Sequence, residues 1–115
     1  MKNLNDLAKE FTRHCPFNYD MHGVRIDRNK GEMIALIHSE LSEALEYERK
    51  GGNDKHLPHR PGAEVEMADA IIRILDYCGY CGYDIDGAVK EKHEYNKTRE
   101  DHKQENRAKK GGKKW

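Results

Sequence analysis

The sequence has little cysteine and no long apolar run, and each shortage excludes a class of protein. Its three cysteines are an odd number, so they cannot all pair as disulfides, and we expect a reducing, cytoplasmic setting. Neither a signal peptide nor a stretch of about 18 apolar residues is visible, so we expect no membrane partner. The glycine patterns of P-loops and dinucleotide-binding folds are also missing.

An excess of charge of one sign is missing as well. The 21 basic and 21 acidic residues cancel, so no overall field attracts nucleic acid, and we expect no such partner. The charges are segregated instead: residues 32–48 hold five glutamates and no Lys or Arg, whereas residues 101–115 hold six Lys or Arg and two acids. Because hydrophobic residues almost vanish after Glu100, we predict one domain over residues 1–99 and a basic, flexible tail over residues 100–115.

Hydrophobic residues recur at helical spacing, and no segment shows the sustained alternation of a β-strand. Caps and turn residues predict helices over about residues 3–14, 32–50 and 63–80, and a fourth after Asp84 or Asp86. Gly79 and Gly82 are predicted to end the third helix. With 36% hydrophobic and 37% charged residues, such helices bury only a stripe, which favours self-association. We predict an all-α fold, an antiparallel bundle of about four helices completed by homo-oligomerisation.

The helix over residues 32–50 carries acids on its apolar side. At about 100° per residue, Glu40 projects into the apolar arc, Glu43 lies at its edge, and Glu46 points to solvent. An ionised carboxylate on a packing face is costly unless it is compensated, and a cation is the usual partner. Glu40 and Glu43 stand three residues apart, so both can reach one hard cation. The apolar arc consists of Met33, Ile34, Ile37, Leu41, Ala44 and Leu45.

Glu66 and Asp69 repeat this spacing in the next helix. If the two helices pack antiparallel, four carboxylates can meet at one level. Oxygen-only ligands suit Mg²⁺ or Mn²⁺, and cations held in this way suit phosphoryl chemistry. The simpler interpretation is a set of solvated helix faces, because acids three apart are common in helices, as Glu91 and Glu94 illustrate.

The two acid pairs, in this order and with residues 44–65 between them, resemble those of the MazG-type nucleoside triphosphate pyrophosphohydrolases. The resemblance covers about residues 32–99. It extends to three whole phrases, which are IHSELSEALEYERKG (Ile37–Gly51), EVEMADAIIRILDYCG (Glu64–Gly79) and EKHEYNKTR (Glu91–Arg99).

The resemblance implies an all-α enzyme, a homodimer or homotetramer, that hydrolyses (deoxy)nucleoside triphosphates to the monophosphate and pyrophosphate and so controls nucleotide pools. The implied cofactor is Mg²⁺, with Mn²⁺ as the alternative. Glu43 is our first candidate for the general base, with Glu40 as the second catalytic carboxylate. The implied metal ligands are Glu40, Glu43, Glu66 and Asp69, and the implied substrate-binding residues are Asn96, Lys97 and Arg99.

The chain departs from the family pattern before its central helix. The family often has aromatic, usually Trp-containing, positions there that contribute to base binding, whereas this chain offers only Phe17 and Tyr19. Base preference is therefore open at this point. The competing function is that of a catalytically weak helical oligomer that acts as a nucleotide-binding or protein-interaction module.

Three other patterns compete with the acid pairs. An H-x-E at His38 followed by Cys78-x-x-Cys81 superficially matches the zinc deaminase signature, which requires its cysteines at a helix start. Here the cysteines fall at a predicted helix end, which also disfavours a thioredoxin-like redox pair. A zinc site that joins these cysteines to His56 and His59 rests on a single C-x-x-C and is a weak signal.

Overall fold

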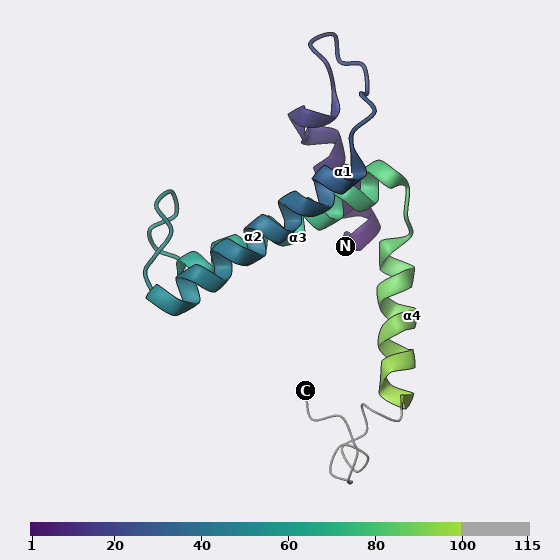
Figure 1. The fold of residues 1–115 in the computed structure, drawn as a ribbon. Helices are drawn as coiled ribbons and strands as arrows, with labels where there is room; N and C mark the ends of the chain where they lie inside the picture. Colours follow the sequence, from purple (N-terminus) through teal and green to yellow (C-terminus); the bar gives the residue numbers. More distant parts are fainter. Residues whose placement is uncertain (100–115) are drawn as a thin grey trace. The chain divides into compact units, whose positions relative to one another are not determined.

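The structure is a computed structural model that describes residues 1–99, and every regular element within that range is helical. This confirms the all-α prediction. The predicted tail, residues 100–115, lies outside the described residues. None of the described helices is long and apolar enough to cross a membrane. In chain order the elements are α1 (Leu4–His14), the short 3₁₀ helix η1 (Pro16–Asn18), α2 (Lys30–Lys50), α3 (Gly62–Cys81) and α4 (Ile85–Thr98) (Figure 1).

The helices begin at residues whose side chains can cap them. Asn3 and Asp6 form a capping box at the start of α1, in which each side chain accepts the other residue's backbone N–H at 2.9 and 3.0 Å. Asn29 and Asp84 cap α2 and α4 by accepting a backbone N–H three residues further on. The local sequence therefore determines where these helices start.

The two glycines predicted to end α3 have different roles. Gly82 adopts φ 74°, the left-handed conformation that commonly follows a helix C-terminus. Gly79 lies inside α3, so the prediction that it ends the helix was wrong. A Cβ atom at Gly79 would lie 2.4 Å from the carbonyl oxygen of Ala8. Glycine at this position therefore lets α1 pack closely against α3.

The chain divides into two compact units, Met1–Tyr83 and the part that begins at Asp84, and each is described by itself. In the first unit α2 and α3 lie side by side and antiparallel, and α1 packs against α3 (Figure 1). In the second unit α4 has no buried residue. The core of the first unit is small and consists of Ala8, Met33, Ile37, Ala44, Ala70, Leu75, Cys78 and Tyr80.

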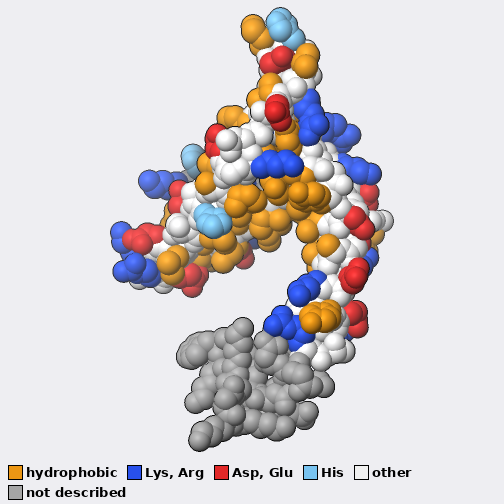
Figure 2. Space-filling view, turned by 45° about the vertical axis from the view of Figure 1, so that its right-hand side comes forward, with side chains coloured by type: hydrophobic (Ala, Val, Ile, Leu, Met, Phe, Trp, Pro, Cys, Tyr) orange, Lys and Arg blue, Asp and Glu red, His pale blue; other side chains and the backbone are white. Residues whose placement is uncertain are grey.

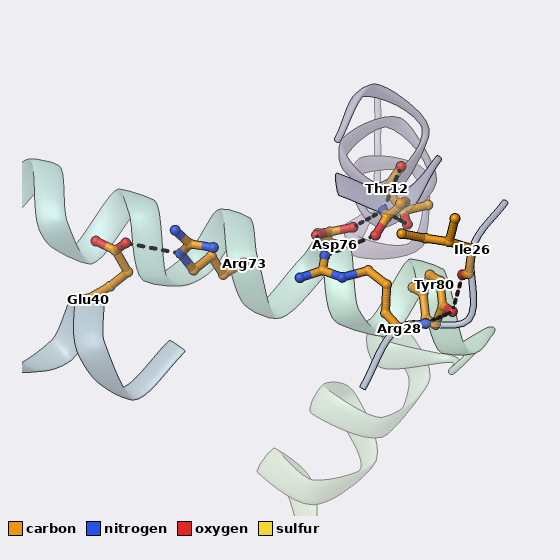
Figure 3. Close-up of polar contacts among 8 residues, drawn as sticks. Thr12, Ile26, Arg28, Glu40, Arg73, Asp76 and Tyr80 are labelled. Carbon is orange, nitrogen blue, oxygen red and sulfur yellow. Dashed lines mark hydrogen bonds and ion pairs between the residues drawn. The ribbon is translucent and has the colours of Figure 1, made fainter. Parts of the chain in front are cut away.

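A buried polar network fastens the segment between α1 and α2 to α3. Asn18 is 1% exposed, and its amide donates to the hydroxyl and carbonyl oxygens of Thr12, both at 3.0 Å, and to Asp76 at 2.8 Å. Its own carbonyl oxygen accepts from the Arg28 guanidinium at 3.0 Å. The Tyr80 hydroxyl accepts the backbone N–H of Arg28 at 2.8 Å (Figure 3). A segment predicted only as a loop is thus held in place by side-chain hydrogen bonds.

Much of the apolar surface of the α2–α3 pair is left uncovered. Within the arc predicted on α2, Met33, Ile37 and Ala44 are buried, whereas the other three members are exposed. Figure 2 shows hydrophobic side chains gathered along this pair of helices. An apolar face of this kind on one chain marks an interaction surface. Its members are Ile34 (38% exposed), Leu41 (43%), Leu45 (60%), Met67 (50%), Ile71 (55%) and Ile74 (37%).

Candidate metal centre

Three of the four predicted metal ligands meet where α2 and α3 pack together. Glu40 and Glu43 of α2 and Glu66 of α3 each offer a carboxylate oxygen, and these oxygens lie within 4.8 Å of one another. The three-residue spacing places both α2 acids on the side that faces α3. Glu43 is exposed, Glu40 is half-buried, and Glu66 is only 9% exposed. We call these three residues the acid trio.

Asp69, the fourth predicted ligand, lies one turn beyond Glu66 on α3 and is not a member of the acid trio. Its side chain is half-buried. Burial raises the pKa of the Asp69 carboxyl, and the negative charge of Glu40 acts in the same direction. The charge of the trio therefore affects the pKa of Asp69, although the Asp69 carboxylate is not among the oxygens that lie within 4.8 Å of one another.

Glu66 is the member of the trio whose charge is hardest to accommodate. Its Oε2 atom is buried and, within residues 1–99, accepts no hydrogen bond when all three carboxylates are ionised. A hydrogen bond shared with Glu40, together with burial and the nearby Glu43, raises the pKa of Glu66 from 4.5 to about 8. At neutral pH the metal-free trio therefore holds a proton. A divalent cation could take the place of that proton.

Arg73 of α3 provides the cation that compensates Glu40. Its Nε donates to Glu40 Oε1 at 3.0 Å, and the two side chains are 35% and 12% exposed, respectively (Figure 3). The spacing of the acids alone does not predict this contact. The available signal was the position of Arg73 on the same helical strip as Glu66 and Asp69, four residues beyond the latter. Arg73 engages one oxygen of Glu40.

The acids border two cavities of different chemistry. The first, about 450 Å³, is lined by two trio members and by residues from the end of α2 and the following connector, and we call it the connector cavity. The second, about 380 Å³, is bordered by Glu40 and Asp69 and has two phenylalanines in its lining; we call it the aromatic cavity. The connector cavity is lined by Glu43, Glu46, Tyr47, Lys50, Gly51, Asp54, Lys55, His56 and Glu66. The aromatic cavity is lined by Phe11, His14, Cys15, Phe17, Glu40, Asp69, Ile72, Arg73 and Asp76.

The two aromatic residues considered for base binding separate in the structure. Phe17, 66% exposed, lines the aromatic cavity beside the acids. Tyr19 lines a different and larger cavity, about 680 Å³, which no member of the acid trio borders. Of the two, only Phe17 lies in a cavity that the acids also line.

The predicted substrate-binding residues belong to the second unit. Asn96 and Lys97 lie on α4, and Arg99 follows its last residue. The Lys97 ammonium donates to Glu94 at 2.8 Å, and Asn96 is half-buried. Because the two units are described separately, the approach of these residues to the acid trio stays a prediction.

The cysteine-based alternatives gain no support from the geometry. Cys78 is buried inside α3 and Cys81 is its last residue, while His38 is exposed on α2. Burial raises the pKa of the Cys78 thiol, which disfavours the thiolate that zinc binding and redox exchange require. Among residues 1–99 the acid trio is the one group of His, Cys, Asp and Glu side chains close enough to share a metal ion.

The donor set of the trio fits a hard divalent cation. All of its ligand atoms are carboxylate oxygens, which suit Mg²⁺ and Mn²⁺, and the unpartnered Oε2 of Glu66 is a buried anionic acceptor that a cation would satisfy.

Comparison of the chain with models of protein families, with curated proteins and with solved structures found no match.

Proposed function

We propose that this chain is a Mg²⁺-dependent nucleoside triphosphate pyrophosphohydrolase, which converts a (deoxy)nucleoside triphosphate to the monophosphate and pyrophosphate. One observation carries the proposal: Glu66 is buried, has an unpartnered carboxylate oxygen, and offers a carboxylate oxygen within 4.8 Å of oxygens of Glu40 and Glu43. Ionised together, these three groups repel one another, and a bound cation would offset that repulsion. The type of reaction comes from the resemblance of the acid pairs and of the phrase EKHEYNKTR (Glu91–Arg99) to the MazG-type enzymes.

The acid trio would hold Mg²⁺, with Asp69 as a further ligand on the aromatic-cavity side. When bound, Mg²⁺ polarises a phosphoryl oxygen and lowers the pKa of a water molecule. Glu43, the most exposed member, would accept a proton from the attacking water as the water oxygen bonds to phosphorus. The bond between that phosphorus and the bridging oxygen of pyrophosphate then breaks. Arg73 fixes the orientation of Glu40 through the 3.0 Å contact.

Substrate binding would use an aromatic residue of the first unit and three polar residues of the second. Phe17 offers an exposed aromatic face in the aromatic cavity, where a nucleobase could stack. Asn96, Lys97 and Arg99 would contact the phosphates, with the two basic residues offsetting negative charge. The triphosphate would bind the acid trio through Mg²⁺.

We also propose that the chain acts as a homodimer or homotetramer. A second copy would cover the apolar face of the α2–α3 pair, including Leu45 and Ile71, which are 60% and 55% exposed. The absence of any buried residue on α4 favours the same conclusion, because an isolated helix of this length is marginal in water.

Pyrophosphate release from a panel of nucleoside triphosphates, measured with and without Mg²⁺, tests the activity. Glu40→Gln and Glu66→Gln are expected to lower turnover at least about 100-fold, because each removes a charged metal ligand. Glu48→Gln on α2 and Glu64→Gln on α3 are the matched controls, because both acids are exposed and lie outside the trio. Turnover of Glu66→Gln equal to that of the controls would contradict the assignment.

The uncovered apolar face also suits the second candidate function, a nucleotide-binding or protein-interaction oligomer with little turnover. Such a protein would bind Mg²⁺ and nucleotide through the same trio and leave every triphosphate in the panel intact. The panel therefore separates the two functions.

A further inference from the structure

We propose that the connector between α2 and α3, residues 51–61, forms the binding site for the terminal phosphates of the substrate. In this assignment Lys55 and His56, together with Lys50, bind the pyrophosphate part of a Mg²⁺–polyphosphate in the connector cavity. The inference rests on the proposed function and deepens it, because it gives the polyphosphate a direction across the acid trio.

The connector cavity is lined by both acidic and basic side chains, and its acids include Glu46 and Asp54 besides two trio members. Glu43 and Glu66 are the members of the acid trio in this lining, and Lys50, Lys55 and His56 supply its basic groups. Lys50 pairs with Glu46 at 2.8 Å and is 74% exposed. Within the described part of the chain Lys55 makes no ion pair, so its ammonium is available to a ligand.

Hydrogen bonds fix the backbone of the connector, and this restricts the positions of its basic residues. Asp54 is 9% exposed, and its Oδ2 atom accepts the backbone N–H groups of His56 and Leu57 at 2.9 and 2.8 Å. The backbone N–H of Asp54 donates to the carbonyl of Arg60 at 3.0 Å, which closes the turn. These bonds hold Lys55 and His56 on the side of the connector that lines the cavity.

The base of the connector is held in the same way. Gly62 donates its backbone N–H to the carbonyl of Gly52 at 3.0 Å, so the two ends of the connector meet. A Cβ at Gly62 would lie 2.2 Å from the ring of Tyr47, so glycine allows α3 to start directly against α2. Preorganisation of this kind reduces the entropic cost of binding a ligand.

A magnesium–polyphosphate offers partners to both the acidic and the basic groups of this cavity. Its metal ions face the carboxylates of Glu43 and Glu66, and its phosphate oxygens accept hydrogen bonds from the ammonium of Lys55 and the imidazole of His56. The carboxylates of the cavity would repel an anion without a metal ion. A metal ion without an anion would leave the basic groups without a partner. The aromatic cavity, by contrast, has no Lys in its lining, and its Arg73 already donates to Glu40. The terminal phosphates therefore extend from the trio toward the connector.

Titration of the full-length protein with inorganic pyrophosphate in the presence of Mg²⁺, followed by calorimetry, tests this assignment. Lys55→Met combined with His56→Gln is expected to weaken pyrophosphate binding about tenfold or more, because two charge-assisted contacts are lost. The matched control combines Lys9→Met with His22→Gln, two exposed residues that lie outside the connector and line neither cavity, and should retain binding within about twofold. The single variant Lys55→Arg, which keeps the positive charge, should retain most of the affinity for pyrophosphate.

Three outcomes would overturn the inference: no pyrophosphate binding by the wild type, unchanged binding by the Lys55 and His56 double variant, or an equal loss in the control. The result is distinguishable from failure of the hydrolase proposal. If the protein leaves triphosphates intact but the double variant selectively loses pyrophosphate, the connector site stands and the hydrolase fails. If triphosphates are hydrolysed and the double variant binds pyrophosphate normally, the connector site fails and the hydrolase stands.

Discussion

The proton held by Glu66 predicts that the affinity for divalent cations depends strongly on pH. The pKa of Glu66 is about 8 in the metal-free protein, raised by its shared hydrogen bond with Glu40, by burial and by Glu43. A metal ion binds the ionised carboxylate, so below pH 8 it must displace that proton. Affinity should therefore rise with pH up to about 8 and then level off.

The size of the effect follows from the displaced proton. When one proton leaves for each metal ion bound, the apparent affinity changes about tenfold per pH unit below the pKa. Because pH 6 lies two units below the pKa of about 8, we expect the affinity to rise about 100-fold between pH 6 and the plateau above the pKa. Glu66→Gln has no proton to displace, and its weaker affinity should lose this component of the pH dependence.

Calorimetric titration with Mn²⁺ in buffers of different ionisation enthalpy measures both quantities. The wild type should release about one proton per metal ion at pH 6 and almost none at pH 9. Glu64→Gln, an exposed acid on the same helix, is the control and should behave as the wild type does. Wild-type affinity that is independent of pH, or an unchanged slope in Glu66→Gln, would refute the reasoning.

Three further predictions concern stability and assembly. Without metal, the raised pKa of Glu66 stabilises the folded state fully below pH 4.5, and this contribution is lost as pH rises through about 8; thermal melting should show the loss, and Mg²⁺ should suppress it. Asn18→Ala should lower the free energy of unfolding in urea by about 2–4 kcal/mol, because it leaves the buried Asp76 without its 2.8 Å donor; a loss below about 1 kcal/mol would contradict this. Ile71→Glu should dissociate the proposed oligomer in sedimentation velocity runs, whereas His93→Glu on α4 should not; an unchanged sedimentation coefficient for Ile71→Glu would count against the proposed interface.

The parts of the fold that could be predicted from the sequence depend on local chemistry. Asn3, Asn29 and Asp84 each supply a side-chain acceptor at a helix start, and Gly82 supplies the left-handed residue at a helix end. Helical spacing also placed Glu40 on a face turned toward a neighbour rather than toward solvent. In each case the determining residues lie within one or two turns of one another.

What could not be predicted depends on partners distant in sequence. The contact between Asn18 and Asp76 joins residues 58 positions apart, and that between Arg73 and Glu40 joins residues 33 apart. Periodicity identified Leu45 as a member of an apolar arc but could not show that one chain leaves it uncovered. The three-residue spacing also predicted the same role for Asp69 as for the other acids. Spacing along α3 does not reveal how far each of its carboxylates lies from α2.

The most direct measurement of the central claim is the anomalous X-ray scattering from crystals grown with Mn²⁺. The account predicts a Mn²⁺ peak between α2 and α3, about 2.0–2.2 Å from carboxylate oxygens of Glu40, Glu43 and Glu66. The peak should be weaker in crystals of Glu66→Gln grown under the same conditions. A wild-type crystal with Mn²⁺ bound elsewhere, or with no peak at the trio, would contradict the claim that these acids form a metal centre.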